Sequence, residues 1–126
     1  MPRAVPLPTE AELDLLSVLW RRGPATVRDV QQALGRDAGY TTVLKLLQIM
    51  HAKGLVTRDE SRRTHVYAAA VEREETEGGL VDELARRAFG GSAGRLVMRA
   101  LSDRTASPEE LAEIRRLLDA ADEGRA

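Results

Sequence analysis

The stretch that decides the fold of this chain runs from residue 40 to residue 67 and reads YTTVLKLLQIMHAKGLVTRDESRRTHVY. Its first half predicts a helix over residues 41–53, because apolar residues recur there at helical spacing. The stripe expected to face the core consists of Val43, Leu46, Leu47 and Met50. Gly54 follows directly, and it is expected to end the helix in a left-handed conformation.

The second half of the same stretch predicts a two-stranded antiparallel ribbon. Residues 55–59 and 64–68 are expected to be the strands, with the polar residues 60–63 as the turn between them. Arg62 and Arg63 stand at the tip of this turn. A helix followed at once by such a ribbon is typical of a winged helix-turn-helix, in which the ribbon is the wing.

The residues before this stretch predict two shorter helices. Thr9 and Glu12 have the spacing of a capping box, and a Gly-Pro pair at residues 23–24 marks the end of the first helix. Thr26 is expected to cap the second helix, which ends before a loop at residues 35–39. Three helices and a ribbon in this order predict a winged helix-turn-helix domain.

We assign that domain to residues 1–70. Residues 1–7 are expected to form an extended tail because prolines interrupt them, and Trp20 and Tyr67 are expected in the core. The fold class that follows is mainly α with a small β-wing, a winged helix-turn-helix domain followed by a helical dimerisation region over residues 71–126.

The predicted dimerisation region contains helices alone. One is expected over residues 72–89, with the pair at residues 78–79 (Gly-Gly) as a weak spot or as the sign of a later start. A short helix follows, and Ser107 begins another, with Glu110 closing a capping box. These helices are too narrow to enclose a core, so we expect a second copy of the chain to cover them. The residues expected in that interface are Leu80, Leu84, Leu96, Leu111, Ile114 and Leu118.

The composition excludes several classes of function. The chain has 126 residues, no Cys and two His. The absence of Cys excludes disulfides and thiolate metal sites, and two His leave few of the common catalytic combinations. We expect no enzyme activity, no metal and no cofactor. The sequence holds no long apolar run and no signal peptide, which predicts a soluble cytoplasmic protein without membrane insertion.

The charge distribution and the predicted helix over residues 41–53 favour contact with double-stranded DNA. Residues 1–67 hold ten Lys or Arg against seven Asp or Glu, a net charge of +3, whereas the remainder carries −4. In a helix-turn-helix the second helix enters the major groove, and hydroxyl, ammonium, amide and guanidinium groups contact phosphates or base edges. The expected DNA-binding residues are Thr26, Tyr40, Thr41, Thr42, Lys45, Gln48, Arg62 and Arg63.

Other interpretations of the same residues remain open. Thr41 would then cap its helix, Lys45 and Gln48 would be solvated, and the two arginines would belong to an ordinary turn. Ile49 and Leu44 could touch a thymine methyl group, but we expect them to pack against neighbouring elements. The alternative function is a winged-helix protein-interaction module without specific DNA binding, and a ligand-gated regulator ranks after it.

Several fragments together resemble the penicillinase-repressor family (BlaI/MecI/CopY type). They are Leu13 with Val18-Leu19-Trp20, Gly23-Pro24, Tyr40-Thr41-Thr42-Val43, Lys53-Gly54-Leu55-Val56 and Val66-Tyr67. The resemblance implies a homodimeric transcriptional repressor that binds a palindromic operator through the helix carrying Thr41, Thr42 and Lys45. It also implies, for some members, relief of repression by a membrane-bound sensor protease that triggers cleavage of the C-terminal region.

This chain departs from the family pattern at three places. Ile49 stands where members often carry Arg, so a different base contact is expected. Arg99-Ala100 stands at the position of the Asn-Phe pair that is cut in β-lactam-responsive members, so the same cut is not expected. The cysteine-rich tail of copper-responsive members has no counterpart, which excludes a copper switch of that kind.

Overall fold

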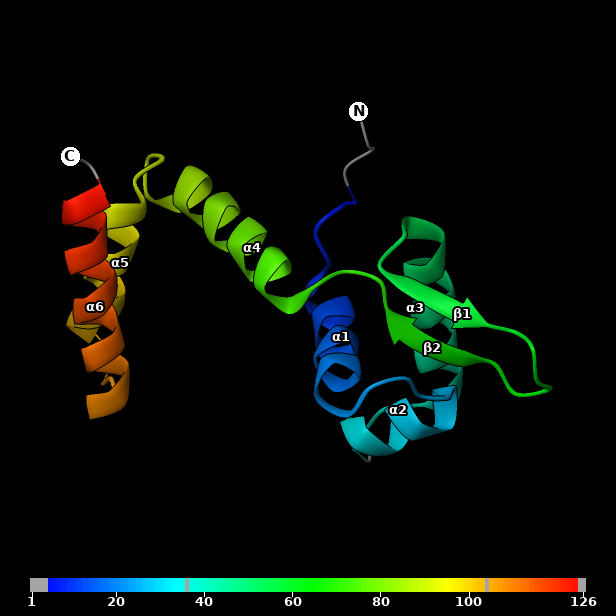
Figure 1. The fold of residues 1–126 in the computed structure, drawn as a ribbon. Coiled ribbons are helices and arrows are strands. Elements are labelled where there is room, and N and C mark those ends of the chain that lie inside the picture. Colours follow the sequence, from blue (N-terminus) through cyan, green and yellow to red (C-terminus); the bar gives the residue numbers. More distant parts are fainter. Residues whose placement is uncertain (1–4, 36, 104, 125–126) are drawn as a thin grey trace. The chain divides into compact units, whose positions relative to one another are not determined.

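The computed structural model describes residues 5–35, 37–103 and 105–124 of the chain. Its elements, in chain order, are α1 (Glu10–Arg22), α2 (Val27–Leu34), α3 (Tyr40–Lys53), β1 (Val56–Asp59), β2 (Val66–Ala69), α4 (Arg73–Ala88), α5 (Ala93–Asp103) and α6 (Pro108–Gly124) (Figure 1). The chain forms two compact units, Met1–Leu80 and Val81–Ala126. The first unit holds three helices and a two-stranded ribbon among its described residues, which confirms the predicted winged helix-turn-helix fold.

Capping boxes begin the first two helices, which confirms the predicted box at Thr9 and Glu12 and the predicted cap at Thr26. The Thr9 N–H donates to Glu12 Oε1 over 2.9 Å, and the Glu12 N–H donates to Thr9 Oγ1 over 3.2 Å. Thr26 and Asp29 repeat this exchange at the start of α2, with both distances at 3.1 Å. Each box satisfies backbone donors that have no partner inside the helix, so the helix starts are set locally.

The core of the first unit collects apolar side chains from all three helices and from the ribbon. The predicted stripe of α3 faces it: Val43, Leu47 and Met50 are buried, and Leu46 packs against them while half-buried. Tyr67 of β2 is also buried, as predicted. Trp20 packs at the edge of this core, and its indole Nε1–H donates to the Val71 carbonyl oxygen over 2.9 Å.

The ribbon differs from its prediction in the bounds of its strands. Strand β2 runs from Val66 to Ala69, so Thr64 and His65 belong to the loop rather than to the returning strand. Pairing begins at Asp59 and Val66, because the Asp59 carboxylate accepts the Ser61 N–H over 2.9 Å and turns the chain there.

A third segment pairs with the other edge of the ribbon at one position. Ala25 donates its N–H to the Tyr67 carbonyl oxygen over 2.9 Å, and Tyr67 returns a bond of 2.8 Å to the Ala25 carbonyl oxygen. Strand β2 is therefore held by β1 on one side and by the residue before α2 on the other. This bridge fixes the wing against the start of α2.

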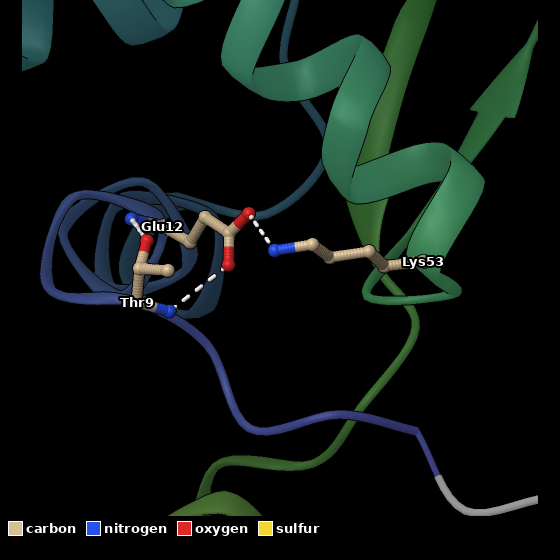
Figure 2. Close-up of polar contacts among 3 residues, drawn as sticks. All are labelled: Thr9, Glu12 and Lys53. Carbon is tan, nitrogen blue, oxygen red and sulfur yellow. Dashed lines mark hydrogen bonds and ion pairs between the residues drawn. The ribbon is translucent and has the colours of Figure 1, made fainter.

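One buried ion pair joins α1 to the end of α3 (Figure 2). Lys53 Nζ lies 2.7 Å from Glu12 Oε2, while the other carboxylate oxygen accepts the Thr9 N–H. The Glu12 side chain is only 2% exposed and that of Lys53 is 32% exposed. Burial would raise the pKa of Glu12, but the hydrogen bonds from Lys53 and Thr9 outweigh it and hold that pKa below its ordinary value.

Helix α4 is continuous through its glycine pair. It begins at Arg73 and runs to Ala88, so Gly78 and Gly79 neither break it nor delay its start. Leu7 of the N-terminal segment lies over Gly79, where a Cβ atom would stand 2.8 Å from Leu7 Cδ2. The part of the predicted tail at residues 1–4 lies outside the described residues.

Replacing Gly78 by Ala is expected to raise the free energy of unfolding by about 1 kcal/mol, because nothing within 4 Å would meet the new Cβ atom and alanine favours the helix. The matched change Gly79→Ala should gain less, since Leu7 must move aside. Urea unfolding of the two variants measures the difference. Equal gains would mean that Leu7 does not rest on α4 in solution.

The second unit contains the end of α4 and helices α5 and α6. Ser107 and Glu110 form the predicted capping box, with distances of 2.9 and 3.0 Å. Side chains of α5 and α6, among them Leu101 and Ile114, line a shared apolar hollow. Among the described residues of this unit only Ala85 is buried, so these helices expose most of their apolar side chains.

Candidate nucleic-acid interface

Helix α3 presents a polar face opposite its core stripe. The predicted DNA-binding residues on this face, all exposed, are Thr41, Thr42, Lys45 and Gln48. At about 100° per residue, Lys45 and Gln48 flank Thr41, and all three lie on the side away from Val43 and Met50. The face can therefore offer two hydroxyls, an ammonium group and an amide to a ligand.

The start of α3 leaves its threonine hydroxyls out of helix capping. Gly39 is the N-cap residue and no side chain forms a capping hydrogen bond there. The interpretation of Thr41 as a cap is therefore wrong, because the helix begins one residue earlier than predicted. Both hydroxyls remain on the exposed first turn, which is the part of a recognition helix nearest to base edges.

Tyr40 lies at the first position of α3 with 44% of its surface exposed. The guanidinium carbon of Arg28 stands 5.7 Å from the centre of its ring, within the range of a cation–π contact. Arg28 was not among the predicted site residues. Its place two residues after the cap Thr26, in the first turn of α2, is the sequence signal that could have indicated it.

Thr26 is half-buried, and its side chain is engaged in the capping box of α2. Its partner Asp29 also lies 3.3 Å from Arg22 Nη1. The backbone N–H and the hydroxyl of Thr26, with Arg22 after them, hold the pKa of Asp29 below its ordinary value. Thr26 therefore orders the start of α2 through its partner Asp29.

The wing carries its two arginines on an exposed tip. Among the described residues Arg62 and Arg63 form no ion pair, whereas the neighbouring carboxylates are engaged locally. Glu60 Oε2 lies 2.6 Å from Arg58 Nε, and that pairing holds the pKa of Glu60 low. Asp59 accepts hydrogen bonds from Ser61, and these, followed by the nearby charge of Arg62, lower its pKa as well. The wing tip can therefore direct both guanidinium groups at an anion.

The structure brings three of the predicted site residues, Thr26, Tyr40 and Arg63, to the lining of one hollow. The start of α2, the exposed face of α3 and the wing all belong to Met1–Leu80 (Figure 1).

A family model described as penicillinase repressor matches residues 8–120 of the chain. The chain belongs to the penicillinase repressor family.

A relative of this penicillinase repressor family member is the transcriptional regulator BlaI of Mycobacterium tuberculosis. The two are 41% identical over 87 residues, which cover 66% of this chain and 63% of the relative. The match therefore spans less than two thirds of the relative's length. The same match is found in a second strain of that organism.

Solved structures share the fold of this family member. The DNA-binding domain of the repressor BlaI matches with a TM-score of 0.50 and 20% identity, over 59% of this chain and 93% of that domain. A transcriptional regulator from Thermotoga maritima matches with a TM-score of 0.51 and 20% identity, over 91% of this chain and 74% of the other. These likenesses confirm the winged-helix fold.

Two apolar residues of α3 differ from each other in their surroundings. Leu44 is half-buried and packs against the core, as predicted. Ile49 is 48% exposed, so the prediction that it packs against a neighbouring element is wrong. Its direction explains the difference, because at about 100° per residue it lies beside Thr42 and Lys45 on the open face of the helix.

The predicted dimerisation residues of this penicillinase repressor family member are all at least partly exposed. Leu84 and Leu118 have exposed fractions of 50% and 58%. Half-buried side chains belong to Leu80, Leu96, Leu111 and Ile114. The neighbouring Met98 and Leu117 are exposed as well, at 62% and 54%. Helices α5 and α6 thus present apolar surface that their own chain does not cover.

The described part of the chain holds no cluster of three or more His, Asp or Glu side chains arranged to bind a metal ion. None of its described helices combines the length and the apolar character needed to cross a bilayer. His51 is half-buried on α3, and His65 is exposed on the wing loop.

Proposed function

We propose that this penicillinase repressor family member is a homodimeric transcriptional repressor that binds a palindromic operator. The observation that carries the proposal is the open polar face of α3 beside an arginine-tipped wing. In the proposed complex α3 lies in the major groove, where Gln48 and Lys45 reach base edges or phosphates. Arg62 and Arg63 reach the backbone or the adjacent minor groove.

The exposed apolar side chains of the second unit support the homodimer. Leu84, Leu117 and Leu118 are each about half exposed, and a symmetric partner would remove them from water. Two recognition helices in such a dimer read half-sites about one helical turn, or a multiple of it, apart. Residues 1–70 then act as the DNA-binding domain and residues 71–126 as the dimerisation region.

Relief of repression is the part of the proposal that involves another protein. A membrane-bound sensor protease that triggers cleavage of the C-terminal region is the partner implied by the resemblance, and the repressor itself acts in the cytoplasm. The Arg99-Ala100 bond lies inside α5 (Ala93–Asp103), so a cut there requires local unfolding of that helix. The mass of the intact protein, isolated from cells before and after induction, measures whether such a cut occurs.

A second candidate function is a protein-interaction module without specific DNA binding. The observation that favours it is Ile49, an apolar side chain with 48% exposure in the middle of the polar face. The full chain carries a net charge of only −1, which gives no general attraction to DNA. Sequence-dependent DNA retention at moderate salt would exclude this alternative.

Selection of sheared genomic DNA by the purified full chain, followed by footprinting of the retained fragments, tests the proposed function. The expected result is a protected sequence with two-fold symmetry next to a promoter. Retention that is weak, independent of sequence and abolished by moderate salt would overturn operator binding. A protein partner would then be sought for the α3 face.

Replacing Lys45 by Ala is expected to weaken binding to the selected operator by about tenfold, because one ammonium contact is lost. The slope of log affinity against log salt should fall by about 2 if that contact is to a phosphate, because each of the two protomers of the proposed dimer loses one. Fluorescence anisotropy at several salt concentrations measures both. Arg21→Ala, an exposed cation on α1, is the control and should leave both unchanged. Wild-type values for Lys45→Ala would remove this residue from the interface.

A further inference from the structure

A hollow of about 360 Å³ with a mixed polar and apolar lining opens beside the recognition helix, between the start of α2, the start of α3 and the wing. The polar side chains that line it are Thr26, Arg28, Tyr40, Arg63, Thr64 and His65. Tyr67 lies behind them, fully buried and paired on both edges of its strand. The hollow therefore has a rigid back wall and a lining of exposed polar groups.

The charge of this hollow is positive. Arg28 and Arg63 contribute two permanent cations from different elements. No carboxylate occurs among the described residues that line it. Two nearby acidic residues are paired elsewhere: Asp29 with Thr26 and Arg22, and Glu60 with Arg58. The chemistry of the hollow thus suits an anion.

The position of Arg28 is set in advance by its neighbour. Its guanidinium carbon stands 5.7 Å from the centre of the Tyr40 ring, so an aromatic face orders a side chain that is otherwise long and exposed. A guanidinium group offers a planar fork of donors that matches phosphate oxygens. Because the guanidinium group is ordered before binding, less side-chain entropy is lost when an anion binds.

The hollow borders the face of α3 that the proposed function places in the major groove. Leu44 lines it and lies about 100° around the helix from Lys45, while Gln48 lies between these two directions. A recognition helix in the groove has the sugar–phosphate backbone along its flanks. The hollow is therefore on the flank of α3, where a backbone phosphate would approach.

We propose that this hollow binds one phosphodiester of the DNA backbone, with Arg28 and Arg63 as the two cations that hold it and Tyr40 as a positioning residue for Arg28. The inference rests on the proposed function and adds three residues to it: Arg28, Thr64 and His65. Because a phosphate is the same in every sequence, the contact sets register and affinity and carries no base specificity.

The first test uses Arg28→Gln, Arg63→Gln and the double variant of the full chain on the selected operator. Each single change should weaken binding by about five- to tenfold and lower the salt slope by about 1.8, which is about 0.9 for one phosphate in each of the two protomers of the proposed dimer. The double variant should be only slightly weaker than either single variant, since both cations serve one ligand. Arg21→Gln is the matched control. Independent, multiplicative losses would overturn the shared phosphate.

The second test removes the charge from the DNA instead of the protein. Single methylphosphonate linkages are placed at successive positions of the operator, and the position that weakens wild-type binding most is identified. The Arg28→Gln and Arg63→Gln variants should bind the operator with this modified linkage as tightly as they bind the unmodified operator. Additional loss in both variants would overturn the proposal. Tyr40→Phe keeps the aromatic ring over Arg28 and should preserve the salt slope, whereas Tyr40→Leu removes the ring and should lower the slope. Thermal unfolding of both variants checks that they are folded. A difference in salt slope between two folded variants would not arise if Tyr40 had only a structural role.

Adding inorganic phosphate at constant ionic strength during operator binding tests whether the hollow takes a phosphate of the DNA backbone or a free anion. We expect it to leave operator affinity unchanged, whereas specific displacement of DNA would reassign the hollow to a small anion. The two proposals fail differently. If no operator is selected, the repressor function fails; if an operator binds but the salt slope of the arginine variants equals that of the wild type, only the phosphate site fails.

Discussion

Replacing Lys53 by Met is expected to lower the free energy of unfolding by about 2 kcal/mol. The change leaves the Glu12 carboxylate, 2% exposed, without its cation at 2.7 Å. Loss of one partner of a fully buried pair costs roughly 3–5 kcal/mol. A smaller loss is expected here because Lys53 keeps 32% of its side chain in water and Glu12 keeps the Thr9 hydrogen bond.

The pH dependence identifies the cause of this loss. In the wild type the pKa of Glu12 is held below its ordinary value of 4.5. The stabilisation is therefore complete above that value, and it is lost as the pH falls through the lower pKa of the folded state. In Lys53→Met the burial of Glu12 acts without the cation, so its pKa rises. The difference between variant and wild type should shrink as the pH falls from about 7 to about 4.

Urea unfolding at several pH values measures both effects. Lys45→Met is the matched control, because it removes an exposed lysine from the same helix and should change stability by no more than about 0.5 kcal/mol. A loss in Lys53→Met that stays constant over the whole pH range would contradict a role for the Glu12 charge. Lost packing of the lysine stem would then explain the destabilisation.

Replacing Leu118 by Glu is expected to dissociate the proposed dimer. Leu118 is 58% exposed on α6, so the change should not unfold the single chain. In the dimer it would place an unpaired carboxylate in an apolar seam, which weakens association by about a hundredfold or more. Sedimentation at micromolar concentration measures the change in mass.

The same variant should lose affinity for the operator. Two linked half-sites bind about a hundredfold or more tightly than one, so a monomer with an intact α3 would bind weakly. Ala112→Glu is the matched control, since it adds the same charge at about 120° around α6 from Leu118. If Leu118→Glu still sediments as a dimer, the interface lies elsewhere in the chain.

Local patterns in the sequence predicted most of the fold. The capping pairs at residues 9–12, 26–29 and 107–110 are made within one turn of helix, and each appears in the structure. The core stripe of α3 follows from helical periodicity, because any helix with those residues must bury the same side. Gly54 ends α3 in a left-handed conformation, as expected from its position.

The candidate interface was predicted only in part. Thr41, Thr42, Lys45 and Gln48 share the exposed face that periodicity assigns to them, because all four belong to one helix. Arg28 was missed, since its relation to Tyr40 crosses from one helix to the next. The exposure of Ile49 was also missed, because periodicity places a residue on a helix shoulder without saying whether another element covers that shoulder.

By itself, therefore, the sequence determined the order of the elements, where helices begin and end, and which face of each is apolar. These features depend on hydrogen bonds and periodicities spanning a few residues. Only the tertiary structure decided the Glu12–Lys53 pair, 41 residues apart, and the bridge from Ala25 to Tyr67. Their partners are far apart in the chain, and a local pattern carries no information about which distant group folding brings near.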